Sequence, residues 1–508
     1  MEFNKQESIV RSYKKLYEST LEQSVDTDFT LPDYYPEVQR ILKIIPEINV
    51  MSSQCSNNGI SIGGQVTITM LYIGSDEQMN SFSHIYPFTK SQEADVVDGG
   101  TVSVLPYIGY INSKAVGPRR VEVHGSIALA VTVGGIENNA VLCSTDCEGI
   151  YLKNLTKPSV SFGETTVKSV FIEDEFQLSQ TQPSISKILR SNASAEITEC
   201  KYVSEKTVLK GELTVEILYC GVNTEKPILL SEKRGFSQIV DCTLNCEEVD
   251  FDTAIRVESL ELHPKTGLDG EVKNVSFEAR VGLQITPYCR TENSFSVDAF
   301  SGKYLADIKY SNINVENAVH KIFENYLCKK KLDFGNTLKT VYDIWCKATV
   351  EHCAKDNADV LIKGTVNVSI LGCEFEGNAV FFERPIEYEY RYPLNDTVKA
   401  IRCKPSVTVS AVGYSLSEDG TADISVELKI KGIVFSVEVL KAVSSIAVDF
   451  ENTVSRDNDT AMILYYPENE TVWDIALKYS TCPKKICEAN LLDSEDTVCN
   501  SVLLIPNI

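Results

Sequence analysis

The sequence predicts a mainly β protein: three tandem, antiparallel, sandwich-like domains followed by a small βααβ module. Two observations predict the three-domain body. An internal repeat recurs at a nearly constant spacing, and apolar residues alternate with polar ones inside each copy. A third observation predicts the module, because apolar residues in the last segment recur with helical spacing. We expect domains at 1–155, 156–305, 306–456 and 457–508.

The internal repeat is clearest between the first two copies. Asp28–Leu42 matches Glu175–Leu189, and Gly64–Tyr72 matches Gly211–Tyr219, each at an offset of 147 residues. A third, more diverged copy contains Gly364–Leu371, which begins 153 residues after Gly211. Several landmarks in one constant register indicate a true duplication. The length of 508 residues also exceeds what one ordinary core supports.

Each copy contains two segments with the period-two alternation of half-buried strands. The earlier segments begin at Gly64, Gly211 and Gly364, and we expect each glycine to serve a bulge or a tight entry. The predicted inward residues of the earlier segments are Val66, Ile68 and Met70; Leu213, Val215 and Ile217; and Val366, Val368 and Ile370. Those of the later segments are Ile127, Leu129, Val131 and Val133; Phe277, Ala279, Val281 and Leu283; and Ile424, Val426, Leu428 and Ile430.

Two stretches of the body favour a helix. Pro36–Leu42 places its proline where the first turn of a helix accepts one, so we expect a short leading helix there. The polar stretch Asn314–Lys331, between the second and third copies, also has partly helical character.

The last segment predicts strand, helix, helix, strand. Val472, Ile475, Ala476 and Tyr479 form one apolar helical stripe. Thr471 precedes this stripe as a candidate N-cap, and Asp474 stands three residues later, in the position of a capping box. The second helix has Pro483 in its first turn and carries Ile486. The flanking segments Met462–Tyr466 and Val502–Pro506 are predicted strands.

At these residues the sequence resembles the LysM family. The matching positions are Tyr465, Pro467, Glu470–Ala476, Lys478, Tyr479, Ile486, Asn490 and Leu504–Pro506. The resemblance implies a structural core of Trp473, Ile475, Ala476, Tyr479, Ile486 and Ile505. It also implies a shallow groove between two loops, which binds N-acetylglucosamine polymers in most of the family. The implied groove residues are Asn469, Glu470, Thr471, Val472, Asn490, Leu491, Leu492 and Asp493. Asn469-Glu470-Thr471 departs from the usual Gly-Asp-Thr, which puts sugar binding in doubt.

The three upstream copies resemble SPOCS domains, on the leader Phe29-x-Leu31-Pro32-Asp33-Tyr34-Tyr35-Pro36 and on Arg40-Ile41-Leu42. Repeated SPOCS domains with one C-terminal LysM module are the layout of SipL-type spore-coat morphogenesis proteins. This resemblance implies a non-enzymatic scaffold in the mother-cell cytosol. Its LysM module would contact the coat-basement ATPase, of the stage IV sporulation protein A type, and tether the coat to the forespore surface.

Charge and composition exclude several classes of partner. The 48 basic and 71 acidic residues give a net charge of −23, which repels nucleic acid and anionic membranes. No segment has the roughly twenty consecutive apolar residues of a membrane span. The first residues lack the apolar core of a secretory signal, so we expect a cytosolic protein with reduced, mostly buried cysteines. We expect no metal site and no cofactor.

The sequence does not predict an enzyme, because reactive residues occur without a constellation that could use them. The P-loop pattern and the His-Glu-x-x-His pair are absent. Neighbouring carboxylates such as Glu247 and Glu248 are typical of a solvated acidic surface. Two alternatives to the scaffold stay open: a LysM protein that binds peptidoglycan of the spore cortex or cell wall, and a self-assembling structural coat subunit.

Overall fold

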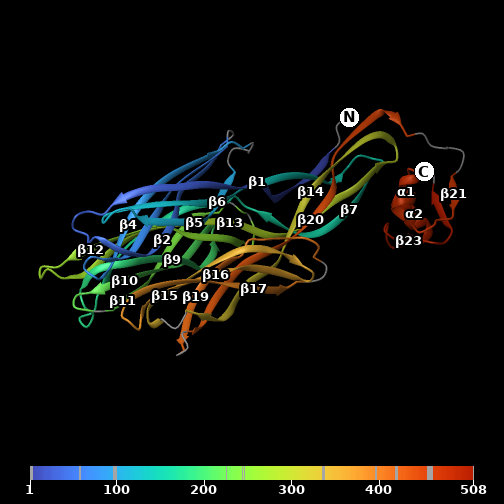
Figure 1. Ribbon diagram of the computed structural model, residues 1–508. Coiled ribbons are helices and arrows are strands. Elements are labelled where there is room, and N and C mark those ends of the chain that lie inside the picture. The colour runs from blue at the N-terminus through green and yellow to red at the C-terminus, as the bar shows by residue number, and fades with distance from the viewer. Residues whose placement is uncertain are drawn as a thin grey trace.

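The computed structural model describes residues 4–56, 59–94, 100–224, 226–242, 244, 246–334, 338–394, 398–417, 421–454 and 461–506. Antiparallel strands build an elongated body, and the small C-terminal module with α1 and α2 lies beyond one end of it (Figure 1). The mainly β, antiparallel prediction is confirmed.

The first part of the body is a unit of two sheets. One sheet has the order β1-β6-β5 and the other has the order β2-β3-β4. Their strands are β1 (Lys5–Thr30), β2 (Val38–Ser56), β3 (Gly59–Gly74), β4 (Met79–Gln92), β5 (Thr101–Ala115) and β6 (Arg120–Thr145). Inward side chains from both sheets, including Val25, Val66 and Ile127, share one buried cluster.

Two further units repeat this arrangement. The second combines sheet β11-β10-β9 with a sheet in which β12, β7 and β8 pair with β13. Its strands are β7 (Ile150–Phe162), β8 (Thr166–Gln177), β9 (Ile185–Val203), β10 (Lys206–Gly221), β11 (Pro227–Asp241), β12 (Asp250–Thr266) and β13 (Val272–Ser301). The third combines sheet β15-β16-β17 with a sheet in which β14, β18 and β19 pair with β20. Its strands are β14 (Tyr304–Asp333), β15 (Leu338–Asp356), β16 (Asp359–Glu374), β17 (Ala379–Pro393), β18 (Ile401–Cys403), β19 (Ser406–Leu416) and β20 (Thr421–Thr453). The predicted inward residues of all three units are buried.

Two of the three boundaries expected from the sequence fall within strands, and the third, 456/457, lies outside the described residues. Position 155/156 lies inside β7, and position 305/306 lies inside β14. The division into 1–155, 156–305, 306–456 and 457–508 stays a prediction.

Gly64, Gly211 and Gly364 lie in the interior of β3, β10 and β16, and each lies opposite a β-bulge. The register of the partner strand shifts between Val50 and Ser52 beside Gly64, and the register of β10 against β9 shifts at Gly211. An aromatic ring also covers each glycine: Phe88 over Gly64, Phe236 over Gly211 and Tyr388 over Gly364, so closely that a Cβ would collide with it. The predicted bulge is confirmed, whereas the alternative of a tight entry is wrong, because each strand begins five residues before its glycine.

Both helices expected in the body are wrong. Residues 38–42 of the expected Pro36–Leu42 helix begin β2, which pairs with β3. Asn314–Lys331 lies within β14, which pairs with β20. The register of β14 shifts between Ala318 and His320, so one residue is inserted into the alternation. Such an insertion turns period two into a local spacing of three, which imitates a helix in the sequence.

The three units form a closed ring around one apolar cluster. The three-stranded sheets β2-β3-β4, β9-β10-β11 and β15-β16-β17 meet at their edges: β4 lies against β9, β11 against β15, and β17 against β2. Leu71, Leu218 and Leu371, from the central strands, meet in the middle. At the other end, the second halves of β6, β13 and β20 pair with β1, β7 and β14 as three arms that share a core. Figure 1 shows β7, β14 and β20 running toward the C-terminal module.

A buried ion pair joins two units inside this ring. Lys43, Arg190 and Asp343 occupy the same register position, opposite Leu71, Leu218 and Leu371. Arg190 donates to Asp343 from Nε and Nη2 at 3.1 and 2.7 Å. Its guanidinium also lies over the ring of Trp345. Lys43 binds Glu383 across the interface between β2 and β17.

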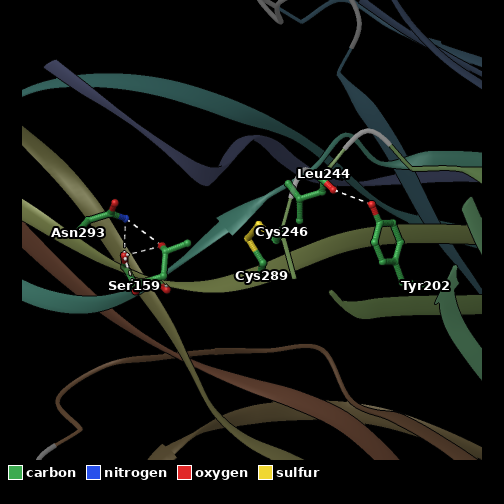
Figure 2. Close-up of a disulfide and its surroundings, with 7 residues drawn as sticks. Ser159, Tyr202, Leu244, Cys246, Cys289 and Asn293 are labelled. Atoms are coloured by element: carbon green, nitrogen blue, oxygen red, sulfur yellow. Dashed lines mark hydrogen bonds between the residues drawn. A yellow bond between two sulfur atoms is a disulfide. The ribbon is translucent and has the colours of Figure 1, made fainter. Parts of the chain in front are cut away.

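One cysteine pair differs from the expectation of free thiols. Cys246 and Cys289 form a disulfide in the second unit, next to the contact that Tyr202 makes with the carbonyl of Leu244 (Figure 2). The expectation of reduced cysteines is therefore wrong for this pair. No local spacing of cysteines could reveal this pair, because Cys246 and Cys289 are 43 residues apart in the sequence.

Candidate docking surface of the C-terminal module

The C-terminal module contains the predicted strand, helix, helix and strand, and also two short strands that were not predicted, β22 and β23. It contains β21 (Met462–Tyr465), β22 (Glu470–Thr471), α1 (Val472–Lys478), α2 (Pro483–Asn490), β23 (Val498–Cys499) and β24 (Leu503–Pro506). β21 pairs with β24, and β22 pairs with β23. Trp473, Ile475, Ala476, Ile486 and Ile505 are buried in one cluster, with Tyr479 half-buried against it.

A capping box begins α1. The Thr471 hydroxyl accepts a hydrogen bond from the Asp474 backbone N–H, and the Asp474 carboxylate accepts one from the Thr471 backbone N–H. Two hydrogen bonds to its carboxylate, first from the Thr471 hydroxyl and then from the Thr471 backbone N–H, lower the pKa of Asp474. The expected N-cap is in place, and it occupies the polar groups of Thr471.

The first loop of the candidate groove contains Asn469, Glu470, Thr471 and Val472. Asn469 has a φ of 59°, the left-handed region that favours glycine and that asparagine tolerates. Asparagine thus adopts a glycine-like backbone at the position where the sequence departs from Gly-Asp-Thr. Glu470 accepts a hydrogen bond from the Tyr465 hydroxyl. Val472 is fully buried, so its side chain is not available to a ligand.

The second loop contains Asn490, Leu491, Leu492 and Asp493. The Asn490 side chain donates to the carbonyls of Ile486 and Leu504 and accepts from the Leu504 N–H, so it fastens α2 to β24. Leu491 caps α2 in the left-handed conformation and is 93% exposed. Leu492 packs against the core, and Asp493 is exposed.

The chain after α2 returns to the first loop. The N–H of Val472 donates to the carbonyl of Thr497, and the N–H of Trp473 donates to the carbonyl of Glu495. The segment that follows the second loop is therefore fixed beside the first loop by backbone hydrogen bonds. Among the described residues of the module, Leu491, at the end of α2, is the most exposed of the large apolar side chains.

Part of the module core comes from the body, which the sequence did not predict. Phe300 of β13 packs edge-on against Trp473, with ring centroids 5.0 Å apart. The Trp473 indole N–H donates to Asp298 at 2.9 Å, and the Tyr310 hydroxyl donates to the same carboxylate at 2.7 Å. Trp473 is thus core, as predicted, but it also fixes the module to the end of an arm. No spacing in the sequence links residues 175 positions apart.

The body also contains a sequence pattern that is typical of one class of hydrolases. Gly59-Ile60-Ser61-Ile62-Gly63 has the Gly-x-Ser-x-Gly pattern, which serves as a nucleophile elbow on a sharp turn from strand to helix. Here the five residues lie inside β3, and Ser61 pairs with Gln54 and Ser91 on the neighbouring strands. A serine in the middle of a paired strand does not form an elbow.

Comparison with known proteins identifies one segment. Residues 184–279 match the family model described as SipL, SPOCS domain. This segment covers β9 to β12 and the beginning of β13, in the second unit. The chain therefore contains a SPOCS domain of the SipL type. Neither the curated proteins nor the solved structures contain a match. Among the described residues, no helix is long and apolar enough to cross a membrane.

Proposed function

We propose that this SPOCS-domain chain is a non-enzymatic sporulation scaffold that works in the mother-cell cytosol at the forespore surface. Three SPOCS repeats form its body, and a C-terminal LysM module binds the coat-basement ATPase of the stage IV sporulation protein A type. The match at 184–279 supports the connection with sporulation. The units on either side of the matched one have the same sheet arrangement, which supports the assignment of three repeats.

The exposure of Leu491 is the observation that supports binding of a partner protein by the C-terminal module. An exposed leucine at a helix end is costly in water and becomes favourable when a partner covers it. The polar groups that a sugar would need are already engaged: Asn490 bonds to α2 and β24, and Thr471 bonds to Asp474. This chemistry favours a protein partner over peptidoglycan.

Leu491→Asn in the full-length chain tests this docking. Asparagine accepts the left-handed backbone at this position, so the module keeps its fold. We expect binding to the purified ATPase to weaken at least tenfold, measured by biolayer interferometry. Leu477→Asn is the matched control, because Leu477 is also exposed but lies on α1. Its binding should stay unchanged.

Two results would contradict the proposal. Equal affinity of the Leu491→Asn variant and the unchanged chain would remove Leu491 from the interface. Sedimentation with purified peptidoglycan that is strong and sensitive to Asn490→Ala, without any binding to the ATPase, would support a wall-binding protein instead.

A further inference from the structure

The outward face of sheet β1-β6-β5 in the first unit carries three different stripes. Residues that pair across the sheet define it row by row: Leu105, Ala130 and Thr20 in one row; Tyr107, Ala128 and Glu22 in the next; Tyr110, Ser126 and Ser24 in the third. β5 therefore contributes large apolar side chains, β6 contributes small ones, and β1 contributes polar or acidic ones. We call this surface the β5 face.

The apolar stripe of the β5 face is open to solvent. Leu105 is 63% exposed, Tyr107 is 42% exposed and Tyr110 is 56% exposed. Between them and β1 lie the short side chains of Ala130, Ala128 and Ser126, none of which is exposed, so the apolar surface open to solvent is on β5. Tyrosine and leucine side chains gathered in this way are typical of protein interfaces, where tyrosine contributes a large area at low entropic cost.

The opposite margin of the β5 face is acidic. Glu18, Glu22, Asp26 and Asp28 alternate along the outward side of β1, and all four are exposed. Arg120 binds Asp28, and His124 lies beside Asp26. Glu22, in the row of Tyr107, makes no ion pair with any described residue. It is the acidic group best placed to meet a cation from outside.

The corresponding faces of the other two units are built differently. In the second unit, Glu278 corresponds to Ala128 and Arg280 corresponds to Ala130. Their partners on β12 are Glu261 and Ser259, which correspond to Tyr107 and Leu105. Arg280 forms an ion pair with Glu258 and lies over Phe171. In the third unit the corresponding residues of β19 are Ala411 and Gly413, opposite Glu427 and Ser425. The three units thus share one sheet arrangement but differ in the residues on this face. Of these three corresponding sets of residues, the set in the first unit combines an apolar stripe with an acidic one.

We propose that the β5 face docks a segment of a partner protein that carries apolar side chains along one edge and lysine or arginine along the other. The charge selects this occupant. A second copy of the chain, with a net charge of −23, and any nucleic acid would be repelled by the acidic margin. This surface is separate from the C-terminal module, so two sites on one scaffold would hold two partners, or two parts of one partner.

A peptide pair tests this inference on the full-length chain. The first probe is a twelve-residue peptide in which lysine alternates with leucine, and the second has glutamate in place of lysine. We expect the lysine peptide to bind and the glutamate peptide not to bind, measured by fluorescence anisotropy at about 150 mM salt, where exposed charges beyond about 8 Å are screened. Leu105→Thr with Tyr107→Thr should weaken binding at least tenfold, and Glu22→Lys at least threefold.

Matched controls separate docking from general attraction to an acidic protein. Glu173 occupies in the second unit the place of Glu22, since it pairs with Glu278, so Glu173→Lys makes the same change of net charge. Phe171→Thr removes an exposed aromatic residue from the same sheet. Both should bind the lysine peptide like the unchanged chain. All variants should keep their melting temperature, because the substituted side chains are exposed.

Three outcomes would overturn the inference. The first is equal binding of the lysine peptide by the Leu105→Thr, Tyr107→Thr variant and the unchanged chain. The second is equal loss of binding in the Glu22→Lys and Glu173→Lys variants, which would mean that net charge alone attracts the peptide. The third is a dimer of the unchanged chain in sedimentation velocity that Tyr107→Thr dissociates, which would assign the β5 face to self-association.

Discussion

The body and the C-terminal module bury their apolar residues in different ways. In the body, each unit has a core of its own between two sheets, and further clusters join the three units at the ring and at the arms. In the module, one small cluster holds α1, α2 and the short strands, and it is completed by Phe300 and Tyr151 from the body. The module therefore depends on the arm for part of its own packing.

The buried polar contacts differ in the same way. The body uses full ion pairs, Arg190 with Asp343 and Arg402 with Glu316, and each joins distant segments. The module is fixed by a neutral donor, the Trp473 indole, on the carboxylate of Asp298. Breaking a buried ion pair leaves a charged side chain buried without a partner. Breaking the indole contact leaves only one neutral N–H without a hydrogen-bond acceptor. We therefore expect substitutions in the ring to lower the unfolding free energy of the whole chain. Substitutions at the contact between the module and the arm should loosen only the module.

The largest effect should follow Asp343→Ala. This substitution leaves the Arg190 guanidinium buried without its carboxylate, which costs about 3–5 kcal/mol of unfolding free energy. Denaturant unfolding followed by circular dichroism measures it. Asp356→Ala is the control, because the pair of Asp356 with Arg391 is exposed to solvent and contributes little to stability.

A double substitution sharpens this prediction. Arg190→Met with Asp343→Leu removes both charges from the ring and should recover most of the lost stability. If Asp343→Ala alone unfolds no earlier than the Asp356→Ala control, the ion pair does not hold the ring together.

The sequence predicted the strands of the body because their chemistry is local and repeated. Val66, Ile68 and Met70 alternate within one strand, and their counterparts recur in the other copies. The ring itself could not be predicted in this way. Arg190 and Asp343 lie at corresponding positions of two repeats but carry opposite charges. In the sequence this difference indicates only that the repeats have diverged, whereas in the closed ring the two side chains form an ion pair. The helix predicted over part of β14 was wrong for a related reason. The bulge is defined by the pairing of β14 with β20, and a single segment of sequence does not show which strand it pairs with.

In the candidate site, the sequence predicted what lies within a few residues and missed what comes from the body. The capping box of Thr471 and Asp474 spans three residues and is confirmed. The bond from Trp473 to Asp298 and the packing of Phe300 depend on where the arm ends, which no local pattern encodes. Val472, assigned to the groove from the resemblance, is instead buried, because it belongs to the apolar stripe of α1 as well as to the loop.

A smaller, local effect should follow Asp298→Ala. The buried Trp473 N–H and the Tyr310 hydroxyl lose their acceptor, which costs about 1–3 kcal/mol at the junction between module and arm. The chain has two tryptophans, so a Trp345→Phe background isolates the emission of Trp473. We expect this emission to shift to the red and the module to be cleaved faster by protease, while the unfolding of the body stays unchanged. Asp307→Ala on the exposed side of β14 is the control. A loss of body stability equal to that of Asp343→Ala would erase the distinction between the two regions.

The smallest effect concerns pH and the start of α1. Hydrogen bonds from Thr471 lower the pKa of Asp474 below its ordinary value, which is about 3.9. A carboxyl whose pKa is lowered by folding stabilises the folded state above its ordinary pKa, and this contribution is lost as the pH falls through the lowered value. Because Asp474 is largely exposed, the cap is worth about 1 kcal/mol or less. Hydrogen exchange of α1 should therefore accelerate as the pH falls below about 4 more in the unchanged chain than in Asp474→Asn, after correction for intrinsic rates. Asparagine has no charge to lose, so identical pH profiles of the two chains would mean that the carboxylate of Asp474 does not hold the first turn.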